Sequence, residues 1–260
     1  MNVSGNTIVI TGGGSGIGRG LAEAFHKEGN QVIIAGRRQE ALEETAKANP
    51  GMKFQLLNVG DAQCIRTFAA RVEKEFSALN VLVNNAGVMH SENLLAQPEE
   101  LKDVEATINT NLLGPMRLTA ALLPVLLAKT KATIMTVSSG LGFVPMAMTP
   151  TYCATKAAIH SYSQSLRYQL KDTAVQVQEL IPPYVQTELQ GARQANDQRA
   201  MPLAEFITET MNILKNSPDV TEICVERVKA QRLAERNGEY DTFFRNFNDA
   251  VAAAANAAAH

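Results

Sequence analysis

Tyr152 and Lys156 stand four residues apart in the stretch Pro-Thr-Tyr-Cys-Ala-Thr-Lys. On a helix, this spacing puts both side chains on one face. A tyrosine hydroxyl with the ordinary pKa of about 10 exchanges protons poorly near pH 7. A neighbouring ammonium favours the phenolate and lowers that pKa. The pair could therefore serve as a general acid–base for a carbonyl/alcohol couple, although the same spacing is also common on plain helix surfaces.

Ser139 follows a short β-branched run, Thr133–Val137, that predicts a strand. In an open parallel sheet, the carboxyl ends of the strands border the ligand crevice. A hydroxyl at that edge could donate a hydrogen bond to a developing alkoxide. Gly140 and Gly142 follow, so Ser139 could instead cap a turn.

A glycine-rich turn, Thr11–Gly18, lies between a predicted strand at Thr7–Ile10 and a predicted helix at Ile17–Glu28. It matches GxxxGxG at Gly12, Gly16 and Gly18 and does not match GxGxxG. Glycines let the backbone approach a phosphate, and the helix N-terminus supplies free N–H groups. The turn therefore predicts a dinucleotide site, with Ser15 and Ile17 among the binding residues.

The second predicted strand, Gln31–Ala35, ends in Gly36-Arg37-Arg38 and has no acidic residue there. A carboxylate at this position would hold the free ribose hydroxyl of NAD, whereas arginine accommodates the 2′-phosphate of NADP. We therefore favour NADP(H) as the cofactor, with NAD(H) possible. Arg37 is placed ahead of Arg38, and the alternative is that both are solvated loop residues.

Short apolar runs alternate with helical patterns along the chain. The pattern predicts an α/β fold, a doubly wound Rossmann-type parallel sheet with helices on both faces, in a single domain. We expect that domain to span residues 1–250, with a substrate lid at about 187–206 and an Ala-rich tail at 251–260. A long helical region is expected from about Pro98 to Ala128, bent or broken at Pro115 and Pro124. No strand is predicted after the run Val175–Ile181.

The composition limits the kinds of partner and location. The net charge of −2 offers no general attraction for nucleic acid. Three scattered cysteines without a CxxC pattern favour a reducing cytoplasm and no metal site. The N-terminus lacks a signal-peptide pattern, and no apolar run approaches the length of a membrane span. We read Cys153 as a packing residue rather than a nucleophile.

Taken together, these residues resemble the short-chain dehydrogenase/reductase (SDR) family, and within it the DltE-like subgroup. Thr11–Gly18 resembles the family's TGxxxGxG turn, and Asn84-Asn85-Ala86-Gly87 its NNAG motif. Asn111, in Ile-Asn-Thr-Asn-Leu-Leu-Gly, is similar to the family's helical asparagine. Ser139, Tyr152 and Lys156 match the family's Ser-x12-Tyr-x3-Lys. The resemblance runs from residue 7 to about 188.

The resemblance implies a reaction. Tyr152 would exchange a proton with the substrate oxygen, and Lys156 would bind the nicotinamide ribose and lower the tyrosine pKa. Ser139 would polarise the carbonyl, and Asn111 would hold a water that links Lys156 to solvent. The further cofactor contacts it implies are with Asn58, Val59, Asn85, Ala86, Gly87, Val185 and Thr187. A homo-oligomer, either a dimer or a tetramer, and a small carbonyl or alcohol substrate are implied as well.

The chain departs from the family pattern in three places. The third strand ends Leu57-Asn58-Val59, where Asp-Val is usual. Pro182-Pro183 replaces the usual Pro-Gly, and the usual seventh strand with its Asp-Gly ending cannot be found. A non-catalytic NADP(H)-binding regulatory protein on the same fold is the main alternative. The intact set of Asn111, Ser139, Tyr152 and Lys156 disfavours it, because a regulator needs no proton donor. A sugar-nucleotide epimerase would need a longer substrate region than follows Thr187.

Overall fold

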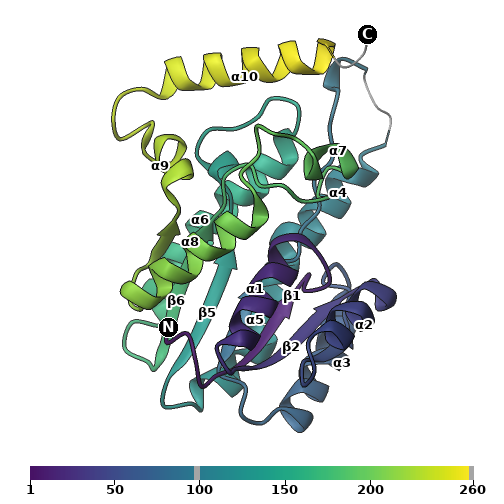
Figure 1. Ribbon diagram of the computed structural model, residues 1–260, viewed down its shortest axis with the longest axis vertical. Helices are drawn as coiled ribbons and strands as arrows, with labels where there is room; N and C mark the ends of the chain where they lie inside the picture. The colour runs from purple at the N-terminus through teal and green to yellow at the C-terminus, as the bar shows by residue number, and fades with distance from the viewer. Residues whose placement is uncertain (97–99, 258–260) are drawn as a thin grey trace.

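A seven-stranded parallel sheet forms the centre of the structure, a computed structural model that describes residues 1–96 and 100–257, without the side chains of 255–257. The strand order is β3-β2-β1-β4-β5-β6-β7, and all pairings are parallel (Figure 1). The runs that form it are rich in β-branched residues, which favour strands. The strands are β1 (Thr7–Thr11), β2 (Gln31–Gly36), β3 (Lys53–Leu56), β4 (Val81–Asn84), β5 (Ala132–Val137), β6 (Val175–Ile181) and β7 (Glu222–Cys224).

Helices cover both faces of this sheet because successive strand residues point to opposite sides. Ile8 and Ile10 of β1 join a core with helices α1, α2 and α8, whereas Val9 joins a core with α3, α5 and α6. The predicted doubly wound α/β fold is confirmed. The α-helices are α1 (Gly16–Lys27), α2 (Gln39–Ala48), α3 (Ala62–Glu75), α4 (Lys102–Ile108), α5 (Gly114–Leu127), α6 (Pro150–Gln169), α7 (Ala192–Ala195), α8 (Leu203–Asn216), α9 (Glu226–Leu233) and α10 (Tyr240–Ala257).

The strand order reverses between β1 and β4. From β1 the chain moves outward through β2 and β3, and it then returns to place β4 on the other side of β1. Ligands of open α/β sheets bind beyond the carboxyl ends of the strands at such a reversal. The glycine-rich turn after β1 and the Asn-Asn-Ala-Gly run at the end of β4 therefore meet at this edge.

The sequence-based expectation that no strand follows Ile181 is wrong. Residues Glu222–Cys224 form β7, which pairs with β6 in the register Glu179–Glu222, Leu180–Ile223 and Ile181–Cys224. Only Ile223 of the three is fully buried. A three-residue edge strand with one buried side chain is too short to produce a recognisable hydrophobic period.

The long helical region contains a break that the prolines only partly explain. Helix α4 leads into a π-helical turn, η2 (Asn109–Leu113), and then into α5. Pro115 lies in the first turn of α5, directly after η2, whereas α5 continues through Pro124. The expected start at Pro98 falls outside the described residues.

The stretch Lys102–Leu127 is apolar and long enough to cross a membrane by length and composition alone, with a mean hydropathy of 1.3 over its best window. Its leucines at 118, 122 and 126 are fully buried in the core against the sheet. This is the pattern of a core helix of an α/β domain.

The C-terminal helix α10 lies across one end of the molecule (Figure 1). The Asn248 side chain accepts a hydrogen bond from the Ala147 amide at 2.7 Å and donates one to the Pro145 carbonyl at 3.1 Å. The alanine-rich residues up to 257 continue this helix instead of forming a separate tail, and 258–260 lie outside the described part of the chain. Helix α10 thus supports the segment that joins Ser139 to Tyr152.

Candidate active site

Helix α6 carries Tyr152 and Lys156 into the interior, where 7% and 5% of their surfaces are exposed. The Lys156 Nζ atom lies 5.5 Å from the centre of the Tyr152 ring and donates a hydrogen bond to the Val137 carbonyl at 2.8 Å. The first turn of α6 is fixed by Glu92, whose carboxylate accepts from the Thr151 amide and hydroxyl at 3.1 and 2.9 Å. The two side chains therefore face the end of β5, as their spacing predicts.

Ser139 lies directly after β5 and faces the tyrosine. Its Oγ accepts a hydrogen bond from the Leu141 amide at 3.1 Å, so it caps the short 3₁₀ turn Gly140–Gly142. The Ser139 side chain lies near enough to Tyr152 to oppose the effect of burial on the pKa of the tyrosine. Of the two roles considered for Ser139 from the sequence, the turn cap is observed, and the contact with a substrate oxygen stays a prediction. A Cβ on Gly142 would lie 2.9 Å from the Lys156 backbone carbon, so only glycine lets this turn rest on α6.

Burial dominates the protonation of the tyrosine and the lysine. It raises the pKa of Tyr152 well above 10, and the nearby Ser139 side chain opposes this only in part. Burial lowers the pKa of Lys156 to about 8, while the charge of Glu179 acts in the opposite direction. In the protein without cofactor, burial thus has the largest effect on the pKa of Tyr152, and the lowering by Lys156 that the resemblance implies stays a prediction. Near pH 7 the site therefore holds a protonated phenol beside an ammonium.

Asn111 sits in the π-helical turn η2, and it is 1% exposed. Its Oδ1 accepts from the Val88 amide at 2.8 Å, and its Nδ2 donates to the Val88 carbonyl at 2.8 Å and to the Thr155 hydroxyl at 3.3 Å. Both N–H donors of the side chain are therefore used to hold the segment after β4 against α6. A Cβ on Gly87 would lie 3.4 Å from Asn111 Oδ1 and 3.8 Å from Lys156 Nζ. Asn111 and Lys156 thus flank one glycine-lined space.

The turn after β1 and the turn after β4 are locked together. The Asn85 side chain donates to the Thr11 carbonyl at 2.8 Å, and Thr11 Oγ1 accepts from the amides of Asn85 and Ala86, both at 3.0 Å. Gly12 has φ of +69°, a conformation that favours glycine. A Cβ on Gly18 would lie 2.3 Å from the Gly12 carbonyl oxygen, so glycine is required where α1 approaches the turn. The Asn85 side-chain amide is therefore used to join the two turns, and its predicted contact with the cofactor stays a prediction.

A groove beside the two turns has a cavity of about 160 Å³. Its walls include seven of the predicted cofactor residues: Gly12, Ser15, Arg37, Arg38, Val59, Ala86 and Gly87. The Arg38 guanidinium donates to Ser15 Oγ at 2.7 Å and so reaches the glycine-rich turn. Sequence reasoning missed further lining residues, of which Val88 directly follows the Asn-Asn-Ala-Gly run and Thr110 adjoins Asn111.

The remaining predicted cofactor residues lie around this groove or beside it. Gly16 and Ile17 begin α1, and a Cβ on Gly16 would lie 3.3 Å from the Thr187 methyl group. The Asn58 side chain accepts from the Gly60 amide at 3.0 Å in a local turn. Val185 is buried, and its carbonyl accepts from Gln194 at 2.8 Å. A glycine-lined groove with two exposed arginines at its rim fits a phosphorylated dinucleotide.

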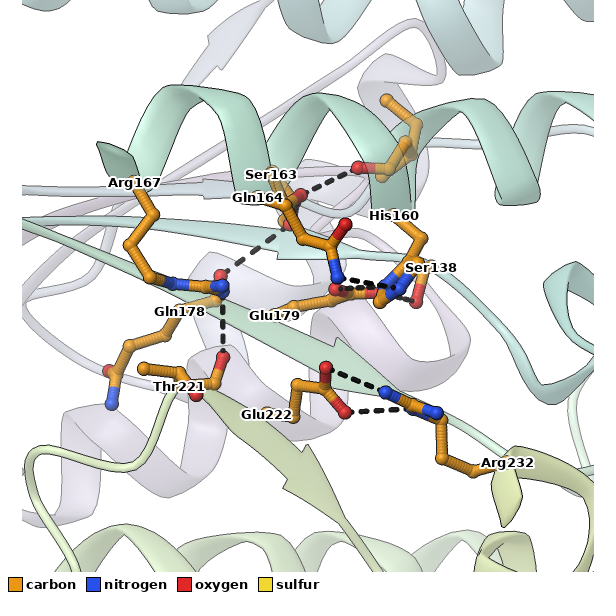
Figure 2. Close-up of polar contacts among 12 residues, drawn as sticks. Ser138, His160, Ser163, Gln164, Arg167, Gln178, Glu179, Thr221, Glu222 and Arg232 are labelled. Carbon is orange, nitrogen blue, oxygen red and sulfur yellow. Dashed lines mark hydrogen bonds and ion pairs between the residues drawn. The ribbon is translucent and has the colours of Figure 1, made fainter. Parts of the chain in front are cut away.

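A second polar cluster lies behind Ser139 and Lys156, and the sequence analysis did not predict it. Figure 2 shows Glu179 between Ser138 and His160, with Glu222 paired to Arg232 nearby. The one available signal was a glutamate within the apolar run Val175–Ile181.

Within the described residues, His160, Glu179 and Glu222 have ligand atoms within 4.8 Å of one another, as a metal site would require. Their polar atoms already have protein partners: His160 and Glu179 bond to each other at 2.8 Å, and Arg232 contacts Glu222 at 2.8 and 3.0 Å. A guanidinium on one carboxylate opposes a cation there, so the cluster has the form of an ion-pair network.

Comparisons with known proteins agree with the parallel α/β fold and with the dinucleotide groove at its edge. A family model described as short chain dehydrogenase matches residues 6–198. The chain is 38% identical over 251 residues to the uncharacterized oxidoreductase DltE of Bacillus subtilis (strain 168), covering 95% of this chain and 98% of that protein. It is 32% identical over 226 residues to an NADP-dependent 3-hydroxy acid dehydrogenase of Schizosaccharomyces pombe, covering 84% and 83%. The closed form of a serine dehydrogenase complexed with NADP+ superimposes with a TM-score of 0.72 at 28% identity, over 80% of this chain and 88% of that one.

Proposed function

This chain belongs to the short-chain dehydrogenase family, and from that premise we propose that it is an NADP(H)-dependent oxidoreductase that interconverts a carbonyl compound and an alcohol. The observation that carries the proposal is the meeting of Ser139, Tyr152 and Lys156 at the carboxyl edge of the sheet, close to the groove beside the glycine-rich turn. A bound NADP(H) would supply or accept the hydride at its nicotinamide ring.

Tyr152 is the proton donor when a carbonyl is reduced. Burial keeps its hydroxyl protonated near pH 7, which suits a donor. The Lys156 ammonium lies 5.5 Å from the ring centre and stabilises the phenolate that forms. Ser139 Oγ accepts from Leu141, which leaves its own proton free to donate to the substrate oxygen. In the oxidising direction, the phenolate form of Tyr152 takes the proton from the alcohol, beside the Lys156 ammonium.

In this proposal, Asn111 holds two segments of the active site in place and does not touch the substrate. Its bonds to Val88 and Thr155 fix the strand end after β4 relative to α6, which carries Tyr152 and Lys156. The predicted water that links Lys156 to solvent would have to be held by backbone atoms of this π-helical turn or by the remaining lone pair of Asn111 Oδ1, because both side-chain donors are used.

The cofactor would occupy the groove, with its phosphates at the turn that contains Gly12 and Ser15. Arg37 and Arg38 would recognise a 2′-phosphate, because both are exposed at the rim and no carboxylate replaces them. The relative named as NADP-dependent and the serine dehydrogenase complexed with NADP+ support this preference. NAD(H) remains the alternative cofactor.

The substrate screen should begin with 3-hydroxy acids. One relative is named as a 3-hydroxy acid dehydrogenase, and serine, named for a similar structure, is itself a 3-hydroxy acid. Simple aldehydes, ketones, sugars and uronates would follow. Turnover is read from NADPH absorbance in both directions.

Tyr152→Phe tests the chemistry. We expect kcat to fall by about 10²- to 10⁴-fold, the usual contribution of a general acid, while the Kd for NADPH changes less than about twofold. Tyr168→Phe is the control, because Tyr168 is on the same helix but 71% exposed. Turnover retained by Tyr152→Phe would exclude Tyr152 as the proton donor. NADPH binding without turnover on the whole panel would favour a regulatory protein.

A further inference from the structure

Glu179 is fully buried on the strand next to one edge of the sheet. It lies on β6, and none of its side chain is exposed to solvent. Burying a carboxylate costs several kcal/mol unless strong partners offset it. Its Oε1 accepts a hydrogen bond from Ser138 Oγ, and its Oε2 accepts from His160 Nδ1 at 2.8 Å (Figure 2). The carboxylate is therefore held by two hydrogen-bonding side chains, a serine and a histidine.

The register of the sheet explains why this carboxylate faces α6. Glu179 pairs with Thr136 of β5, and paired residues of parallel strands point to the same side. The Thr136 hydroxyl contacts Ser163 of α6 at 2.7 Å, which identifies that side. Ser138, two residues after Thr136, points the same way. Between them lies Val137, whose carbonyl accepts from Lys156.

His160 extends the face of α6 that carries the reacting groups, because it lies four residues after Lys156. The Gln164 amide Nε2 lies 3.2 Å from His160 Nε2 and donates to it. That nitrogen is then an acceptor, and the proton of the neutral ring is on Nδ1, facing Glu179. The imidazole in this tautomer brings no positive charge to the carboxylate.

The other charged side chains around Glu179 already have partners of their own. Glu222 of β7 is bonded twice to Arg232 of α9, and Arg167 of α6 donates to the carbonyls of Val177 and Thr221. The further titratable groups that face Glu179 or Lys156 are Cys224 of β7 and Tyr152 of α6. The charge of Glu179 raises the pKa of Lys156, against the effect of burial.

We propose that Glu179 is a positioning residue for the oxidoreductase reaction: its carboxylate fixes Ser138, the neighbour of Ser139, and places a buried acidic group on the side of the sheet that α6 and Lys156 cover. This inference rests on the proposed function for its kinetic consequences, but the charge effect can be measured without turnover. Glu179 touches no reacting atom, and it acts through the serine pair and the lysine.

Glu179→Gln tests the proposal, because it keeps the shape and hydrogen-bonding capacity and removes the charge. The pKa of Lys156 would be measured in the cofactor-free protein by NMR of ¹³Cε-labelled lysine, with the resonance assigned from Lys156→Met. We expect the wild-type value of about 8 to fall by about one pH unit, the effect of losing one nearby opposite charge. The basic limb of the kcat/KM profile should move by the same amount, with kcat reduced more than KM.

Glu222→Gln is the matched control, because it removes a carboxylate of the same cluster that is already paired with Arg232. It should leave the Lys156 pKa and the pH profile in place, whereas Glu179→Asp should restore both toward the wild type. If Glu179→Gln does not fold, the double variant Glu179→Gln/His160→Gln replaces the pair with two amides, and the same fall is expected.

An unchanged Lys156 pKa in the glutamine variant would overturn the proposal, and so would an equal shift in Glu222→Gln. A fall in the pKa without turnover on any substrate would support the charge role of Glu179 and count against the proposed reaction. The two ideas can therefore fail separately.

Discussion

Replacing Lys156 with methionine should make the protein more stable while it removes the activity. The lysine side chain is 5% exposed, and its pKa lies at about 8 instead of the ordinary 10.5. The folded protein therefore holds a charge below pH 8 that burial disfavours. Methionine has a similar length and carries no charge, so it removes this cost.

The size of the effect follows from the displaced pKa. A fall from 10.5 to about 8 corresponds to about 3 kcal/mol of lost stability at neutral pH. Methionine leaves the Val137 carbonyl without its hydrogen bond from Nζ, which costs about 1 kcal/mol. The net gain should be about 2 kcal/mol, which raises Tm by about 4–8 °C in a domain of this size.

The pH dependence identifies the cause. Between pH 8 and 10.5, the folded chain has released the Lys156 proton while the unfolded chain still holds it, so the wild-type free energy of unfolding rises with pH. The advantage of Lys156→Met should be complete below about pH 8 and should shrink as the pH rises to 10.5. Urea unfolding of both proteins without cofactor, at half-unit intervals from pH 7 to 10.5, measures this difference.

Lys171→Met is the control, because Lys171 is exposed on the turn after α6. It should change the free energy of unfolding by less than about 0.5 kcal/mol, at every pH. The reasoning would be refuted if Lys156→Met were no more stable than wild type at pH 7, or if its advantage did not change between pH 8 and 10.5.

Three further substitutions test the groove and its surroundings. Arg38→Ala should weaken NADPH binding by about tenfold or more through loss of a charge-assisted contact, and more than Arg37→Ala does, with NADH binding unchanged; equal losses for both cofactors in fluorescence titrations would exclude recognition of the 2′-phosphate. Gly18→Ala should lower the free energy of unfolding by about 2 kcal/mol or more and impair cofactor binding, because its Cβ would meet the Gly12 carbonyl; an unchanged Tm would show that α1 can move aside. Asn248→Leu breaks both bonds to the segment before α6 and should raise the substrate KM several-fold at constant NADPH affinity; an unchanged KM would separate α10 from substrate binding.

The fold and the meeting of the main motifs could be predicted because they depend on local signals. A β-branched run, a turn with required glycines and an amphipathic helix are each visible within about 15 residues. The reversal of strand order then brings the ends of β1, β4 and β5 together without any further information. This is why Ser139, Tyr152 and Lys156 could be placed at one edge from the sequence.

The features that were missed depend on contacts between distant segments. β7 consists of three residues, and it is a strand only because β6 offers a free edge for Glu222–Cys224. The protonation of Tyr152 was predicted from its neighbour Lys156, but burial by surrounding segments has the larger effect. The bond by which the Asn85 amide joins the turns after β1 and β4 was likewise not predicted. Such competition between partners cannot be read from spacing.

The four-residue spacing on α6 also limits how the chain can change in length. Tyr152, Lys156, His160 and Gln164 form one row along the helix, which links the reaction centre to the buried carboxylate of Glu179. One residue inserted in the middle of this row would turn its two halves by about 100° relative to each other. The residues between these positions can therefore vary in type but not in number. A change in length after Gln164 would leave the four side chains aligned.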